Sequence, residues 1–250
     1  MLKSQREQQI LSVLKQSGGF VSVKNLCKQL YASESSIRRD LTDMENKGYV
    51  KRSYGGAQLL NDLSKITVFN FRYEQYAQEK TEIAKKAVNL IQDNSVIFLD
   101  QSSTSCFLAK ELPNKSTLTV ITNSIEVLNI LSPTKIKVMC SGGILSTDNR
   151  SCLVGSDAER TFSIAHADFA FFSCNALSYD GELSDCTREE VLVRDNIIKN
   201  AKTKVFLCNS SKFGRTSIFK QCSLKDIDYL VSEGDKAQIF ADKGFDLLVL

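Results

Sequence analysis

The sequence predicts an α/β protein built from a small helical module and a larger, mostly parallel sheet. Beyond residue 95, short apolar runs typical of buried strands alternate with helices, which is the pattern of a parallel sheet covered on both faces. Hydrophobic residues make up 42% of the chain and charged residues 24%, as is typical of a globular protein. Residues 1–58 contain ten Lys and Arg against five Asp and Glu, a net charge of +5, whereas the remainder carries −2. This distribution suits a polyanionic partner for the small module alone.

The first 57 residues are predicted to fold as three helices and two β segments. Ser22 and Ser33 can cap helices, and Gly48 can end one. Residues 54–56, Tyr-Gly-Gly, are expected to form a turn. Helix, strand, helix, tight turn, helix and hairpin is the order of a winged helix-turn-helix. The predicted helices span residues 3–17, 23–31 and 34–47, and the predicted strands, which could pair with each other, are Phe20–Ser22 and Tyr49–Ser53.

The third predicted helix has one apolar and one polar face. At about 100° per residue, Ile37, Leu41 and Met44 lie on one side and must face the core. Arg39 then points outward, where it could read a base, and Arg38 lies at the flank, where it could hold a phosphate. A charged outer face is often only solvated, but this one combines arginine with small hydroxyl residues. The predicted DNA-contacting residues are Ser35, Ser36, Arg38, Arg39 and Thr42 on the helix and Lys51, Arg52, Tyr54 and Gly55 on the wing.

The chain is expected to comprise a DNA-binding domain over residues 1–57, a connector over residues 58–72 and a sheet domain over residues 73–250. The stretch after Gly56 shows no strong periodicity, which is why we expect a connector there. Apolar runs and helical patterns alternate in the rest of the chain. The predicted strands of the sheet domain span residues 95–100, 118–122, 136–140, 168–174, 204–208, 228–232 and 245–250, and the predicted helices span residues 73–92, 104–112, 124–131, 156–164, 187–201 and 235–243.

Polar segments follow several of the predicted strands. Open α/β sheets bind ligands beyond the carboxyl ends of their strands. Hydroxyl residues after the first strand open a helix, where free backbone N–H groups attract an anion, and a lysine after a later strand offers it a positive charge. Each signal is weak alone, because serines also cap helices and aspartates also occupy turns. The predicted effector-binding residues are Asp100, Ser102, Ser103, Thr104, Ser105, Asn123, Gly142, Gly143, Asp180 and Lys212.

Several kinds of site are disfavoured by the residue inventory. The chain contains a single histidine, His166. We therefore expect no Ser-His-Asp triad and no histidine-rich metal site, and we predict neither a metal nor a cofactor. The eight cysteines are scattered without a CxxC pair and are expected to act as small buried hydrophobic residues. The first ten residues are too polar for a signal peptide, and no apolar run reaches membrane-spanning length, so a cytoplasmic location is predicted.

The segment "SSIRRDLTDMENKGYVKRSYGGA" closely resembles the helix-turn-helix and wing of the DeoR family of bacterial transcription regulators. The rest resembles the sugar-phosphate-sensing domain of that family, which is related in fold to ribose-5-phosphate isomerase and glucosamine-6-phosphate deaminase. In the family pattern, "LDQSSTS", "ITNS", "SGG" and "NSSKFG" occupy the places of effector-binding loops. The chain departs from that pattern at Tyr54, which replaces a histidine, at Ser102, which replaces a glycine, and at Asn209, which replaces an aspartate.

The resemblance implies a DNA-binding transcriptional regulator, a repressor of sugar metabolism that a phosphorylated sugar releases from double-stranded operator DNA. It also implies a homodimer or homotetramer, with no membrane partner. One alternative is a regulator whose sugar-phosphate response has been lost or altered. Another is a sugar-phosphate isomerase or deaminase with an attached DNA-binding module, which Asn209 disfavours because an amide cannot act as a general base.

Overall fold

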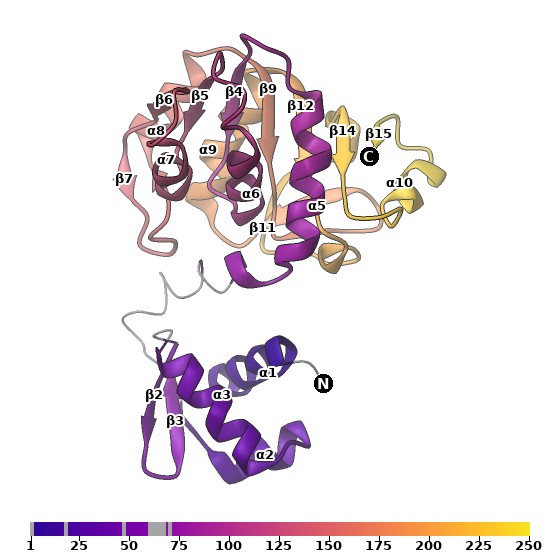
Figure 1. The fold of residues 1–250 in the computed structure, drawn as a ribbon. Coiled ribbons are helices and arrows are strands. Elements are labelled where there is room, and N and C mark those ends of the chain that lie inside the picture. The colour runs from indigo at the N-terminus through magenta and orange to yellow at the C-terminus, as the bar shows by residue number, and fades with distance from the viewer. Residues whose placement is uncertain (1–2, 18–19, 47–48, 60–68, 70–71) are drawn as a thin grey trace. The chain divides into compact units, whose positions relative to one another are not determined.

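The computed structural model describes residues 3–17, 20–46, 49–59, 69 and 72–250, which fall into two compact units, Met1–Phe71 and Arg72–Leu250. The first unit packs three helices against a three-stranded sheet (Figure 1), so the predicted winged helix-turn-helix order is confirmed. Its elements are α1 (Lys3–Gln16), β1 (Phe20–Ser22), α2 (Val23–Leu30), α3 (Glu34–Asn46), β2 (Val50–Ser53) and β3 (Gly56–Leu59).

The pairing predicted between the two β segments is wrong, because β3 lies between β1 and β2 and pairs antiparallel with both. Gly56 permits this arrangement, since a Cβ on it would lie 2.5 Å from the carbonyl oxygen of Val21 on the neighbouring strand. Gln58 and Leu59, which fell within the expected connector, therefore belong to the wing sheet. Most of the remaining connector lies outside the described residues.

A largely buried ion pair joins the first and third helices of this unit. The guanidinium of Arg6 donates to both carboxylate oxygens of Asp40, and Nη2 lies 3.1 Å from Oδ1. Asp40 is 1% exposed, and the core around it contains the fully buried Ile10 and Ile37. The pair therefore fixes the orientation of α3 relative to α1.

Replacing Asp40 with alanine should lower the free energy of unfolding of the first unit by about 3 kcal/mol, because Arg6 would keep a largely buried charge without its partner. Urea unfolding of the full chain, followed by circular dichroism, measures this loss. The double variant Arg6→Met/Asp40→Leu should recover much of it, since both charges are then absent. A loss below about 0.5 kcal/mol for Asp40→Ala, the range of ordinary surface substitutions, would contradict the assignment.

The second unit contains a seven-stranded sheet with the strand order β15-β14-β12-β9-β4-β5-β6, in which all neighbouring strands run parallel. Helices α5, α6 and α7 cover one face, and α9, which packs against α8, covers the other (Figure 1). The predicted parallel sheet is therefore confirmed. Its strands are β4 (Val96–Leu99), β5 (Thr119–Thr122), β6 (Lys137–Cys140), β9 (Ala167–Phe172), β12 (Ala201–Leu207), β14 (Tyr229–Val231) and β15 (Leu248–Val249), and its helices are α5 (Ala77–Ala87), α6 (Ser103–Glu111), α7 (Ile125–Leu131), α8 (Ser156–Ser163), α9 (Arg188–Lys199) and α10 (Gln238–Asp242).

The helix predicted over residues 73–92 is divided in the structure, where residues 72–74 and 77–87 are helical and residues 75–76 form a turn. Tyr76 adopts a left-handed backbone conformation, with φ of 56°, so α5 begins only at Ala77. A 3-10 turn, η1 (Val88–Leu90), follows the helix directly. The interruption at Tyr76 leaves residues 72–76 as a separate segment beside α5.

Two small antiparallel sheets, which the sequence did not predict, also belong to this unit. The first pairs β7 (Ile144–Leu145) with β8 (Leu153–Val154). The second has the order β10-β11-β13 and comprises β10 (Ala176–Leu177), β11 (Glu182–Asp185) and β13 (Phe219–Ser223). Strands β10 and β11 follow β9 and β13 follows β12, so this sheet extends the carboxyl end of the large one.

The described residues bear on two further expectations. No helix among them combines the length and apolar character that a membrane crossing requires. The eight cysteines are free thiols, and four of them are buried as expected, whereas Cys140 and Cys186 are exposed.

Candidate functional site

The exposed face of α3 brings together the predicted DNA-contacting residues of the helix. Arg39 is exposed, and within the described part of the chain its guanidinium has no partner. Arg38 instead forms an ion pair with Glu34, one turn earlier, at 2.6 Å, and both side chains are about half exposed. Ser35 and Ser36 lie at the start of the helix, where both hydroxyls contact Ser33. Arg39 is therefore the side chain most available to a base edge.

The wing is hydrogen-bonded directly to this helix. Arg52 Nη1 donates to Thr42 Oγ1 at 2.7 Å, and the backbone N–H of Arg52 donates to Glu45 Oε1 at 2.8 Å. Tyr54, fully exposed, and Gly55, with φ of 81°, form the hairpin tip, and Lys51 is exposed on β2. Arg52 and Thr42 therefore position the wing on the helix, while Lys51 and Tyr54 remain available for phosphate contacts.

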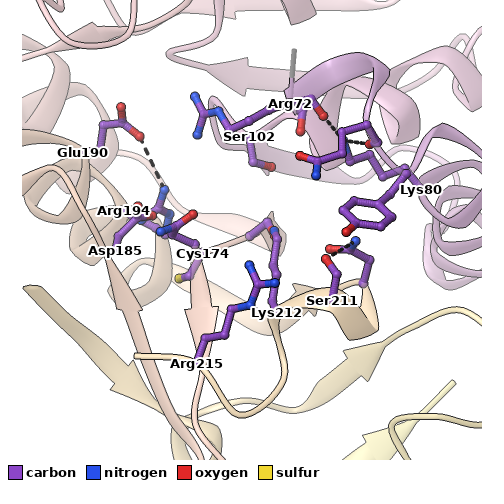
Figure 2. A pocket seen from close by; sticks show the side chains of 16 residues that line it. Arg72, Lys80, Ser102, Cys174, Asp185, Glu190, Arg194, Ser211, Lys212 and Arg215 are labelled. Atoms are coloured by element: carbon purple, nitrogen blue, oxygen red, sulfur yellow. Dashed lines mark hydrogen bonds and ion pairs between the residues drawn. The ribbon is translucent and has the colours of Figure 1, made fainter. Parts of the chain in front are cut away.

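The second candidate site is a cavity of about 100 Å³ at the carboxyl end of the large sheet (Figure 2). Its walls come from the loops after β4, β9 and β12, from α9 and from the segment before α5. Five cationic side chains line it against two carboxylates, so it suits an anionic ligand. The lining residues are Arg72, Gln75, Tyr76, Lys80, Ser102, Ser103, Ser173, Cys174, Asn175, Asp185, Glu190, Arg194, Asn209, Ser211, Lys212 and Arg215.

Lys80 is a buried cation in the wall of this cavity. It lies on the inner side of α5 and is only 3% exposed. Its Nζ donates to the carbonyl oxygens of Arg72 and Gln75, the latter at 2.7 Å. Burial, together with the nearby positive charges of Lys212 and Arg72, lowers the pKa of Lys80 to about 7. A bound anion would stabilise the charged form.

Lys212 reaches the cavity from the loop after β12. Its Nζ donates to Ser173 Oγ at 2.7 Å, and this hydroxyl comes from the loop after β9. The loop that carries Lys212 is itself held in place, because the backbone N–H of Ser210 donates to both carboxylate oxygens of Glu233 at 3.1 Å. Lys212 is therefore positioned without a carboxylate partner among the described residues.

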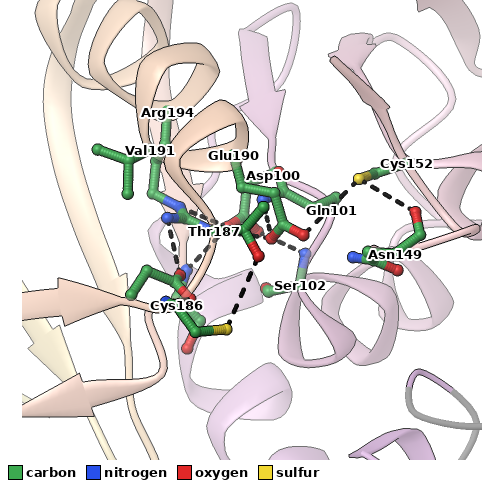
Figure 3. A network of polar contacts seen from close by, with 12 residues as sticks. Asp100, Gln101, Ser102, Asn149, Cys152, Cys186, Thr187, Glu190, Val191 and Arg194 are labelled. Atoms are coloured by element: carbon green, nitrogen blue, oxygen red, sulfur yellow. Dashed lines mark hydrogen bonds and ion pairs between the residues drawn. The ribbon is translucent and has the colours of Figure 1, made fainter. Parts of the chain in front are cut away.

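Arg194 behaves differently, because its charge is compensated within the wall (Figure 3). Its guanidinium, fully buried, forms ion pairs with Asp100 at 3.1 Å and Asp185 at 2.9 Å, and it donates to Gln221 at 2.8 Å. Glu190 lies one turn earlier on α9, at 3.9 Å. This network holds Arg194 in the wall, whereas Lys80 and Lys212 have no carboxylate partner among the described residues.

Three of the ten predicted effector residues, Ser102, Ser103 and Lys212, line the cavity. Ser102 has φ of −69° and caps α6, its hydroxyl accepting from the N–H of Ser105, so a serine is accommodated where the family pattern has glycine. The other seven predicted residues are absent from the described lining. Asp100, Thr104, Ser105 and Asn123 are fully buried behind it, Gly142 and Gly143 follow β6, and Asp180 lies in the exposed turn between β10 and β11.

Several lining residues were missed by sequence reasoning. Lys80 could have been identified from the sequence, since it lies three and four residues before the buried Ile83 and Ala84 and therefore on the same face of the helix. A lysine on an apolar face is unusual, because lysine is almost never fully buried without a partner. Arg194 likewise falls on the buried face of α9. Arg72 and Arg215 lie in segments without periodicity, where no sequence pattern indicates the direction of a side chain.

A winged helix-turn-helix with an exposed arginine, together with an α/β unit that holds a cationic cavity, defines a DNA-binding protein with a ligand-sensing domain. Two family models match the chain: a DeoR-like helix-turn-helix domain over residues 6–62 and a DeoR C-terminal sensor domain over residues 75–234. The chain belongs to the DeoR family of transcriptional regulators, and it is a regulator rather than an enzyme.

Similar proteins cover nearly the whole chain. The HTH-type transcriptional regulator GolR of Listeria innocua is 33% identical over 93% of this chain and 91% of its own. The HTH-type transcriptional repressor GlcR of Bacillus subtilis is 33% identical over 100% and 97%, and the glycerol-3-phosphate regulon repressor of Escherichia coli is 28% identical over 93% and 92%.

Two solved structures are similar to this chain at low sequence identity, and the first of them, with a TM-score of 0.50, shares its fold. The translation initiation factor eIF-2B of Pyrococcus horikoshii is 13% identical, with a TM-score of 0.50 over 92% of this chain and 88% of that one. A ribose 5-phosphate isomerase A from Methanocaldococcus jannaschii is 21% identical, with a TM-score of 0.42 over 56% and 55%.

Proposed function

We propose that this regulator is a repressor that binds operator DNA through α3 and the wing and releases it when a phosphorylated sugar occupies the cavity. The observation that carries the proposal is the placement of Lys80 and Lys212, two cations without carboxylate partners among the described residues, in the wall of one cavity. A phosphate monoester carries about −1.5 to −2 charges at neutral pH and accepts several hydrogen bonds. The names of two relatives, a repressor and a glycerol-3-phosphate regulon repressor, support the same function.

The residues available for the sugar and for the phosphate differ in character. Ser102, Ser103 and Asn175 offer neutral donors and acceptors that suit hydroxyl groups. Lys80, Lys212 and Arg215 offer positive charge. We also propose that the protein acts in the cytoplasm, where its DNA lies, and as a homodimer or homotetramer, because half-sites about 34 Å apart require two winged helices.

The proposal is tested by measuring whether sugar phosphates dissociate the protein from an operator selected from random-sequence DNA. A sugar phosphate at 100 times its dissociation constant should also stabilise the protein by about 2.7 kcal/mol in thermal unfolding. Lys80→Met and Lys212→Met should abolish both responses while retaining DNA binding. Lys85→Met, an exposed position on the same helix, should retain both. If no sugar phosphate changes either measurement, the regulator has lost the response and the proposal fails.

Above about pH 7, Lys80 should take up a proton when the effector binds. Because the pKa of Lys80 is lowered to about 7, this residue is largely neutral at pH 8 in the free protein, and a bound phosphate raises the pKa again. Affinity should therefore fall as the pH rises above 7. Titration calorimetry at pH 8, in two buffers with different ionisation enthalpies, measures the uptake. A dianionic phosphate takes up no proton of its own at this pH, so equal binding enthalpies in both buffers would contradict the role of Lys80.

A further inference from the structure

One wall of the cavity is formed by the segment through which the chain enters the second unit. Residues 72–76 precede α5, and Arg72 is the first residue of this unit. Arg72, Gln75 and Tyr76 line the cavity (Figure 2). Lys80 does so from α5, and every other residue of the described lining lies beyond residue 100. Among the lining residues, this segment is therefore the closest along the chain to the connector and the DNA-binding unit.

Lys80 holds this segment beside α5 through its side chain. Its Nζ donates to the carbonyl oxygen of Gln75 at 2.7 Å and also to that of Arg72. The charged form of a lysine has three N–H groups, so one of them remains for a ligand in the cavity. Hydrogen bonds from a charged donor are stronger than those from a neutral one. An anion that keeps Lys80 charged therefore strengthens the two bonds that hold the segment.

Other contributions to the position of the segment oppose one another. The ring of Tyr73 packs against Phe107 of α6, with the ring centroids 5.1 Å apart, which favours the observed position. Tyr76 has φ of 56° and ψ of 38°, a left-handed conformation that is unfavourable for residues other than glycine. Burial of the charged form of Lys80 is also unfavourable. We therefore expect a small difference in free energy between a docked segment and one that is detached from the wall.

We propose that residues 72–76 switch between the docked position of the structure and a detached one, and that this switch links the cavity to DNA binding. The inference rests on the proposed function. An effector contacts the wall that the segment forms, so it binds the docked state and shifts the population towards it. Operator DNA favours the detached state, because effector and DNA oppose each other and the coupling between two sites is reciprocal. The signal passes along the chain from Arg72 into the connector.

Hydrogen–deuterium exchange of the full-length protein, measured by mass spectrometry, tests the switch without an effector. Binding of the selected operator should make the backbone amides of residues 72–80 exchange faster by about fivefold or more, the low end of typical couplings between two sites. The N–H of Lys80 belongs to this set, since it donates to the carbonyl oxygen of Tyr76 at 3.0 Å. Amides of α8, an element outside the described lining, should be unchanged. Equal exchange of residues 72–80 with and without operator would overturn the inference.

Sugar phosphates should shift the segment in the opposite direction. The probes are glycerol 3-phosphate, ribose 5-phosphate, glucose 6-phosphate and fructose 6-phosphate, with sodium chloride at equal ionic strength as the control. A ligand that binds only the docked state, at 100 times its dissociation constant, lowers the population of the detached state about 100-fold. With the probe that stabilises the protein most, amides of residues 72–80 should therefore exchange more slowly by about tenfold or more. A bound probe that leaves their exchange unchanged would contradict the switch.

Tyr73→Ala removes a contact that holds the docked segment and leaves the described lining of the cavity unchanged. Because a smaller fraction of the protein is then docked, sugar-phosphate affinity should fall by about threefold or more. Residues 72–80 should exchange faster in the free variant, and operator affinity should not fall. Phe169→Ala, which removes a stacked ring pair on β9, is the matched control and should change none of these properties. Thermal unfolding establishes that both variants are folded.

The outcomes separate this inference from the proposed function. If sugar phosphates dissociate the operator while residues 72–80 exchange equally in every state, the inference is overturned and the proposed function stands. Wild-type sugar-phosphate affinity in folded Tyr73→Ala would likewise overturn it, because docking of the segment would then contribute nothing to binding. If no sugar phosphate binds to the folded protein, both fail.

Discussion

Replacing Arg194 with methionine should lower the free energy of unfolding of the sensor unit by about 3 to 5 kcal/mol. The guanidinium is fully buried and forms ion pairs with Asp100 and Asp185, the side chains of which are at most 5% exposed. Its removal leaves these two carboxylates and Glu190 buried together without a counter-charge, whereas methionine fills a similar volume. The loss therefore reflects uncompensated charge more than lost packing.

Urea unfolding at pH 7 measures this loss. Arg188→Met provides a matched control, because Arg188 lies on the same helix but is exposed, and a surface substitution of this kind changes stability by at most about 0.5 kcal/mol. Arg194→Lys should recover only part of the loss, since a point charge cannot reproduce the separate contacts that the planar guanidinium makes. A variant Arg194→Met that unfolds within 1 kcal/mol of the wild type would show that the network contributes little to stability.

The large sheet could be predicted because its strands are buried on both faces. Runs such as "VIFL" in β4 and "VFL" in β12 are continuously apolar, and sequence reasoning detects that pattern directly. The β10-β11-β13 sheet is different, because "ELSD" and "FKQCS" alternate weakly and owe their strand conformation to each other. Strands formed by tertiary pairing leave little trace in a single sequence.

The position of the cavity was predicted better than the residues that line it. The rule that ligands lie beyond the carboxyl ends of strands led to Ser102, Ser103 and Lys212, which line the cavity. The same rule selected Asp100, but a residue at a strand end can equally turn into the wall, and here it accepts from Ser105 and pairs with Arg194. The sequence thus indicates which residues lie at the edge of the sheet. The direction of each side chain depends on partners from distant segments, which a single sequence does not reveal.

Replacing Arg39 with alanine should weaken binding to the selected operator by about 1 to 3 kcal/mol, which corresponds to roughly 5- to 150-fold in affinity. Ile37 and Leu41 are buried in the core of the first unit, so α3 cannot rotate and Arg39 must point outward. Its guanidinium is free of intramolecular partners within the described residues, so a base contact would not require an existing ion pair to be broken. A bidentate contact to guanine should make the loss specific to one base position.

Arg38→Ala is the matched comparison, because Arg38 is the adjacent arginine on the same helix and differs in its surroundings. Its ion pair with Glu34 must be released or shared before it can hold a phosphate, so its loss should be smaller and equal on specific and non-specific DNA. Fluorescence anisotropy at several salt concentrations separates the two roles. Arg38→Ala should reduce the slope of log affinity against log salt concentration by about one, the value expected for one lost phosphate contact. Arg39→Ala should instead reduce the ratio of the affinities for operator and mismatched DNA. If Arg39→Ala lowers affinity equally for both DNAs, Arg39 contacts the backbone, and the base-reading role belongs to another residue of α3.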